Sequence, residues 1–89
     1  MKAKVSNCYV LQRIQHADRF EDNPKELFGV FVGKAKIAKS KARIAMMNLL
    51  RSNELMPVKD ESCSGGGIEI WWHMGDMFLI ERQIMWVFK

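Results

Sequence analysis

The sequence has few of the features that mark exported, membrane-bound or disulfide-stabilised proteins. Its two cysteines, Cys8 and Cys63, lie far apart, whereas a small secreted domain usually contains four or more. No run approaches the roughly 18 apolar residues of a membrane span. Residues 1–10 contain two lysines but no apolar core of a signal peptide. These absences predict a protein of the reducing cytoplasm that does not associate with membranes.

Patterns that signal catalysis or metal binding are also scarce. Cys63 lies in the Ser/Gly-rich stretch 62–67 and could act as a nucleophile with His16 or His73 as base. Nothing in the sequence orients such a base, and no Gly-Lys-Ser/Thr follows the glycines to make a phosphate loop. Cys8, His16, Cys63 and His73 are ligand types for zinc without the paired spacing of structural sites. We therefore expect no enzyme, no cofactor and no metal site.

Chain length and composition limit the architecture. A chain of 89 residues buries only about 60 to 65% of its unfolded surface, so it can build a single core. The content of 48% hydrophobic and 27% charged residues is that of a folded domain and not of a disordered tail. We predict one domain over residues 1–89. Within it, residues 52–67 include Pro57 and three consecutive glycines, which predicts a mobile surface connection.

Three short segments have the pattern of strands. Residues 8–14 and 68–74 alternate in polarity, and residues 27–32 are apolar and rich in aromatic and β-branched side chains. For the first of these, a short helix beginning at Val5 is the alternative interpretation. The polar stretch 16–26 between the first two strands is predicted to be a loop.

Residues 36–51 have the clearest periodicity, that of an amphipathic helix. Its apolar stripe consists of Ala38, Ala42, Ala45, Met46 and Leu49, with Leu50 beside them. The small alanines would allow the helix to approach a sheet closely. Lys39 and Arg43 lie on one border of the stripe, while Lys41 and Arg51 lie away from it, so the bases are expected to stay in water.

The C-terminal residues 77–88 leave two interpretations open. They fit the second strand of a hairpin, and they also fit a helix capped by Asp76, which periodicity alone does not distinguish. Taken as a hairpin, they complete a small α+β domain of order β-β-α-β-β, with the helix packed on one face of an antiparallel sheet. The other face of that sheet would be partly open.

All of the excess positive charge lies in one segment. The net charge is +4, and the segment between positions 34 and 51 has no acid. It contains six bases: Lys34, Lys36, Lys39, Lys41, Arg43 and Arg51. Such a segment either contacts phosphates or forms a solvated helix face. Bases near a helix N-terminus oppose the helix dipole, which favours a functional role.

Part of this segment resembles a known family. Residues 27–50, a strand followed by Lys39-Ser40-Lys41-Ala42-Arg43, are similar to the last strand and helix of double-stranded RNA-binding domains, whose helix opens with lysines and continues in alanines. The resemblance implies that Lys39, Lys41 and Arg43 contact phosphates across a groove. It covers about a quarter of the chain. The family's first helix is absent, and two predicted strands follow where that domain would end.

The C-terminal part of the chain is crowded with aromatic and methionine side chains. Adjacent residues of a strand point to opposite faces, so Trp71 and Trp72 can both be buried only if the sheet is covered on both sides. We expect one of them to be exposed. An exposed tryptophan beside adaptable methionines is typical of a protein-binding hot spot, although a core filled by bulky residues is the alternative.

Two functions are therefore weighed. The first is a non-enzymatic regulatory or inhibitory protein that docks on a larger protein through Trp71, Trp72 and the basic segment. Such a chain is similar in style to phage accessory proteins that blunt host defence or redirect host machinery, which would place it in the host cytoplasm. The alternative is a DNA- or RNA-binding protein that contacts phosphates through the helix at 34–51. A homodimer is compatible with either function.

Overall fold

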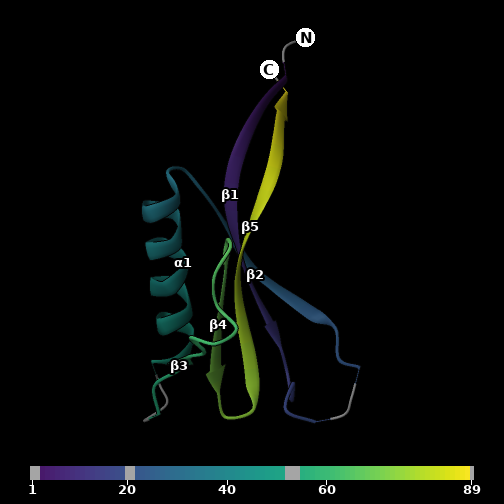
Figure 1. Ribbon diagram of the computed structural model, residues 1–89, viewed down its shortest axis with the longest axis vertical. Coiled ribbons are helices and arrows are strands. Elements are labelled where there is room, and N and C mark those ends of the chain that lie inside the picture. The colour runs from purple at the N-terminus through teal and green to yellow at the C-terminus, as the bar shows by residue number, and fades with distance from the viewer. Residues whose placement is uncertain (1–2, 20–21, 52–54, 89) are drawn as a thin grey trace.

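The computed structural model describes residues 3–19, 22–51 and 55–88, which contain one helix and one five-stranded sheet (Figure 1). The elements in chain order are β1 Ala3–Ile14, β2 Lys25–Val32, α1 Ala35–Leu50, β3 Val58–Lys59, β4 Ile68–His73 and β5 Asp76–Phe88. The sheet order is β2-β1-β5-β4-β3, and all neighbouring strands are antiparallel. The predicted α+β fold is confirmed, with the short strand β3 added to it.

The C-terminal segment is a strand. The β4–β5 hairpin turns at Met74 and Gly75, whose φ angles of 50° and 83° fit a type I′ turn. From this turn, β5 pairs with β1 along the whole length of β1, from Met77 opposite Ile14 to Phe88 opposite Ala3. The strand β1 therefore begins five residues before the predicted start. Residues 3–7 have no strand pattern of their own, but they pair with the C-terminal end of β5.

The helix α1 packs on one face of the sheet. The core consists of Tyr9 and Leu11 from β1, Phe78 and Ile80 from β5, and Ala38, Ala42, Met46 and Leu50 from α1. The prediction placed Leu49 in the buried stripe, but Leu49 is 47% exposed and Leu50 is buried instead. The helix contacts the sheet through every fourth residue. Because a turn has 3.6 residues, this line of buried side chains shifts gradually around the helix. No helix in the described part of the chain is long and apolar enough to cross a membrane.

The connection after α1 forms specific hydrogen bonds in its described part, from residue 55 onward. The Asp60 carboxylate accepts hydrogen bonds from the Ser62 hydroxyl at 2.7 Å and the Cys63 amide at 3.2 Å. The Ser64 hydroxyl accepts one from the Ile70 amide at 3.0 Å. Residues 52–54 of the predicted connection lie outside the described residues.

One end of the molecule is a two-stranded ribbon. The strand β2 reaches only to the level of Cys8, and β4 only to the level of Glu81. Beyond them, residues 3–7 of β1 pair only with residues 84–88 of β5. Figure 1 shows this ribbon extending past the end of α1 to the chain termini. It lengthens the molecule to 47 Å, against 26 and 24 Å along the other axes.

Candidate functional site

The face of the sheet opposite α1 is covered by no helix of the described chain. We call it the open face. By strand register, its side chains are Val58, Ile68, Ile70, Trp72, Met77, Leu79, Glu81, Cys8, Val10, Gln12, Ile14, Lys25, Leu27, Val30 and Val32. Glu81 and Lys25 are the charged residues of this set, and the Asp60 carboxylate contacts the face at Trp72. Cys8, Val10 and Leu79 at its centre are buried by their neighbours, whereas Leu27, Val30, Val32 and Val58 toward its margins are exposed.

The aromatic residue of the open face is Trp72. It lies between Val58 on β3 and Met77 on β5 and is half-buried. Its indole N–H donates to the Asp60 carboxylate at 3.1 Å. Hydrogen bonds from Ser62 and then from Trp72 lower the pKa of Asp60 to about 2. The ring is thus held in one orientation and presents apolar surface beside a thioether.

Trp71 lies on the other face, as strand alternation predicted. It packs against the core under α1, and its indole N–H donates to the Glu69 carboxylate at 3.1 Å. Of the two candidate tryptophans, only Trp72 belongs to the open face. The sequence therefore predicted that the pair would be divided between the two faces. The prediction that one of them would be exposed is wrong, because neighbouring side chains leave both half-buried.

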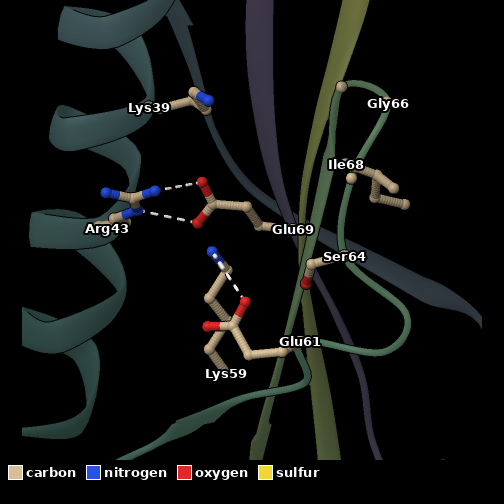
Figure 2. Close-up of a pocket in the computed structure, with 10 residues that line it drawn as sticks. Lys39, Arg43, Lys59, Glu61, Ser64, Gly66, Ile68 and Glu69 are labelled. Atoms are coloured by element: carbon tan, nitrogen blue, oxygen red, sulfur yellow. Dashed lines mark hydrogen bonds and ion pairs between the residues drawn. The ribbon is translucent and has the colours of Figure 1, made fainter.

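A polar pocket of about 220 Å³ lies between α1 and the Gly-rich turn that precedes β4 (Figure 2). Lys39 and Arg43 approach it from the helix, Lys59 from β3, and Glu69 from β4. Ser64 and the three glycines of residues 65–67 form another wall. Lys59 is also near Glu61, with 3.7 Å between Nζ and the carboxylate.

Arg43 and Glu69 form a two-point ion pair in this pocket. The Arg43 Nε lies 2.8 Å from Oε1 of Glu69, and a second guanidinium nitrogen contacts Oε2. Burial of Glu69 would raise its pKa, but hydrogen bonds from Arg43 and Trp71 outweigh burial and lower the pKa. The same carboxylate raises the pKa of Arg43 through its hydrogen bonds. Arg43 therefore neutralises a buried acid of its own chain.

The remaining predicted bases do not form one surface. Lys34, Lys36, Lys41 and Arg51 are exposed, and Lys39 is half-buried with Nζ 5.9 Å from the centre of the Tyr9 ring. Lys39 and Lys41 point about 160° apart around the helix. The structure thus brings Lys39 and Arg43 together at the pocket and directs Lys41 elsewhere.

Two groups of surface residues were missed by sequence reasoning. One is the exposed margin of the open face on β2, formed by Leu27, Val30 and Val32. The other is on the ribbon, formed by Val5, Ile84 and Trp86. Residues 27–32 have no polar side chain, so the sequence predicted a strand there but did not show which of its side chains would lie on an uncovered face. The ribbon residues became recognisable only with the long β1–β5 pairing.

The candidate catalytic and metal-binding residues remain separate. Among the described residues, Cys63 is exposed and contacts Ser62 and Asp60, whereas the buried His73 has Nε2 3.0 Å from the Leu55 carbonyl. No hydrogen bond within the described ranges joins Cys63 to either histidine. In the same ranges, no three His, Cys, Asp or Glu side chains are grouped so that they could hold a metal ion.

Comparisons with protein-family models, with curated proteins and with solved structures found no match to this chain. The resemblance to double-stranded RNA-binding domains therefore rests on its short lysine- and alanine-rich segment alone. One of the three residues that it assigns to phosphate contacts, Arg43, is engaged by Glu69.

Proposed function

We propose that this protein is a small non-enzymatic docking module that binds a larger protein through the open face of its sheet. The observation that carries the proposal is that the sheet is covered by α1 on one side only, while most of the side chains on its other side are apolar and those of Leu27, Val30 and Val32 are exposed. Exposed apolar side chains that lie together on a protein surface often mark a binding site.

The size of the molecule is compatible with such an interface. A stable protein–protein contact buries about 800 Å² on each partner, which is about one eighth of the 6345 Å² surface of this chain. Trp72 and Met77 are side-chain types that contribute strongly at the centre of interfaces. The exposed bases of α1 would lie outside this contact and influence the rate of association more than the affinity.

A regulatory or inhibitory role follows from the proposal, because a docking module without catalytic groups acts by occupying a partner's surface. This matches the style of phage accessory proteins that act on host defence or on nucleic-acid-handling machinery. We place its action in the cytoplasm, which would be the host cytoplasm for a phage-encoded chain.

The test compares acids placed on two different surfaces. Val30→Glu with Val32→Glu introduces charge on the open face, and Ile37→Glu with Ile44→Glu makes the same change on the exposed side of α1. Partners would be cross-linked in the cells that produce the protein and quantified by mass spectrometry. The proposal expects specific partners to be retained by the helix variant and lost from the open-face variant. Equal retention by both variants would remove the open face from consideration.

A second comparison addresses the tryptophan. We expect Trp72→Ala to weaken partner binding by about 2 kcal/mol or more, as truncation of a central aromatic anchor does. Lys39→Glu combined with Lys41→Glu changes peripheral charge and should cost less. The opposite ranking would contradict the proposed contact.

The alternative function, nucleic-acid binding, is favoured by the exposure of Lys34, Lys36, Lys41 and Arg51 in a segment without acids. Its test is fluorescence anisotropy of labelled duplex DNA, duplex RNA and single strands at two salt concentrations. Tight binding that is lost at higher salt and on Lys34→Glu with Lys41→Glu would replace the docking proposal. Absence of binding at low salt would reject the alternative.

A further inference from the structure

The ribbon formed by residues 3–7 and 84–88 has little support from the rest of the domain: Ser6 and Asn7 line a pocket with residues 32–35, and the remainder extends beyond it. Its two strands pair with each other, while β2 and β4 end before they reach it. An isolated two-stranded ribbon is marginally stable in water, and a third strand or a packed surface is normally needed. A further contact in the assembled protein would supply what the single chain lacks here.

One side of this ribbon is mostly apolar, with Asn7 as a polar residue among Val5, Ile84 and Trp86. Val5 lies opposite Trp86 and Asn7 opposite Ile84, and by alternation from Leu11 and Ile80 these side chains are on the side of α1. Trp86 is 60% exposed and Ile84 is 66% exposed, since α1 ends before it reaches them (Figure 1). This apolar side is opposite to the open face, so the two surfaces are separate.

The outer edge of β5 is also unpaired along the ribbon. The Arg82 amide donates to the Gly67 carbonyl at 2.8 Å on the β4 side. Backbone groups of alternate residues in a strand point to the same edge, so the N–H and C=O groups of Ile84 and Trp86 point to the β4 side as well. No strand of the described chain lies there. An edge with aromatic and β-branched residues is a ready site for pairing with another strand.

The overall dimensions indicate how much surface such a contact would cover. A compact domain of 89 residues has a radius of gyration of about 12 Å, whereas this chain has 14.1 Å. A monomer of 10.3 kDa is expected to expose about 5,400 Å², whereas this chain exposes 6345 Å². The excess of about 1,000 Å² is close to the surface that each partner of a standard interface buries.

We propose that two copies of this chain form a homodimer in which the ribbon edges of β5 pair antiparallel across a two-fold axis. A two-fold interface requires a surface that is complementary to itself. The ribbon meets this requirement, because identical strand edges pair antiparallel about such an axis and identical apolar side chains then pack together. None of the ribbon side chains that the structure describes, at positions 5–7 and 84–86, is charged, so pairing them across two copies brings no like charges together. The open face of each copy stays free for the proposed docking.

The test is the molar mass of the purified protein, measured by sedimentation equilibrium over a concentration series. We expect wild type to approach twice 10.3 kDa and Ile84→Lys with Trp86→Lys to weaken dimerisation at least tenfold. Both side chains are exposed in the single chain, so the variant should still fold, which circular dichroism would verify. The matched control, Ile37→Lys with Ile44→Lys on α1, should dimerise like wild type.

Amide exchange of wild type gives a measurement that does not depend on a variant. We expect the Ile84 and Trp86 amides to become protected as concentration rises through the dimerisation range. A monomer at all concentrations, including one that associates only with a different protein, would overturn the proposal. A dimer unaffected by Ile84→Lys with Trp86→Lys, or one without protection of these amides, would also overturn it. Loss of the docking function with an intact dimer would count against the open face alone.

Discussion

At the scale of single residues, the Arg43–Glu69 ion pair joins α1 to β4 across the polar pocket. We predict that Arg43→Ala destabilises the protein by about 1–3 kcal/mol, because it leaves the carboxylate of Glu69 buried without its main donor. The cost stays below that of a fully buried pair, since the Arg43 side chain is 39% exposed against 7% for Glu69. Urea unfolding would measure it, with the exposed Lys41→Ala as a control expected within about 0.5 kcal/mol of wild type. Equal effects of the two variants would show that the pair contributes little.

Asp60 gives a residue-scale prediction for pH. Its pKa is lowered from 3.8 to about 2 in the folded protein, so the unfolded chain takes up the proton first as pH falls. The stabilisation is complete above pH 3.8 and is lost as pH falls through about 2. Urea midpoints measured between pH 5 and pH 2 should fall less steeply for Asp60→Asn than for wild type. Parallel curves for the two proteins would show that Asp60 does not contribute.

The residue scale also shows what sequence reasoning can predict about the site. Alternation was sufficient to place Trp71 and Trp72 on opposite faces. It could not pair Arg43 with Glu69, because these residues are 26 positions apart and meet only when α1 packs on the sheet that contains β4. Whether a base remains available to a ligand depends on such contacts, and charge counting along the chain does not reveal them.

At the scale of elements, the β4–β5 turn has an unusual residue in its first central position. A type I′ turn requires positive φ at both central residues and favours Asn-Gly, but this turn has Met74 with φ of 50°. We predict that Met74→Asn stabilises the protein by about 0.5–1 kcal/mol, because asparagine adopts this conformation at lower cost. Thermal unfolding would show a higher midpoint. A lower midpoint would mean that the methionine side chain makes a contribution larger than its backbone cost.

The alanines of α1 set its distance from the sheet. Ala38 and Ala42 are fully buried, so a larger side chain there has no space. We expect Ala42→Leu to destabilise the domain by about 1–3 kcal/mol through overpacking. The exposed Ser40→Leu adds a similar apolar group to the same helix and should change stability by less than about 0.5 kcal/mol. Similar urea midpoints for the two variants would contradict close packing at Ala42.

Local periodicity predicted helices and strands correctly where the pattern of a segment matched the way that it packs. The helix was predicted to within one residue at each end, and β2 and β4 were recognised as strands. The buried residues of the helix differ from the prediction at Leu49, because the helix contacts the sheet through every fourth residue and therefore buries Leu50 instead. The strand β3 has two residues, which is too short for any period, and it exists only because β4 lies beside it.

At the scale of the whole molecule, the sequence predicted one sheet with one helix on it and a partly open second face. It did not predict the ribbon, because residues 3–7 form a strand only through pairing with the opposite end of the chain. The two uncovered apolar surfaces are likewise products of strand register. The open face is the basis of the docking proposal and the apolar side of the ribbon is the basis of the homodimer proposal. The two surfaces lie on opposite sides of the sheet.

The distribution of charge over the whole molecule leads to a prediction for nucleic acids. The bases of residues 34–51 point in different directions around α1, Arg43 is paired with Glu69, and the ten acids outnumber the eight bases elsewhere. A duplex should therefore meet few bases at once. Since each phosphate contact contributes about −0.9 to the slope of log K against log salt, we expect a slope of magnitude below about 3. Anisotropy titrations of a labelled DNA duplex between 50 and 200 mM salt, a range of about fourfold, would measure it. A slope near 5 would mean that the bases converge on one surface, and nucleic-acid binding would then replace protein docking as the function to pursue.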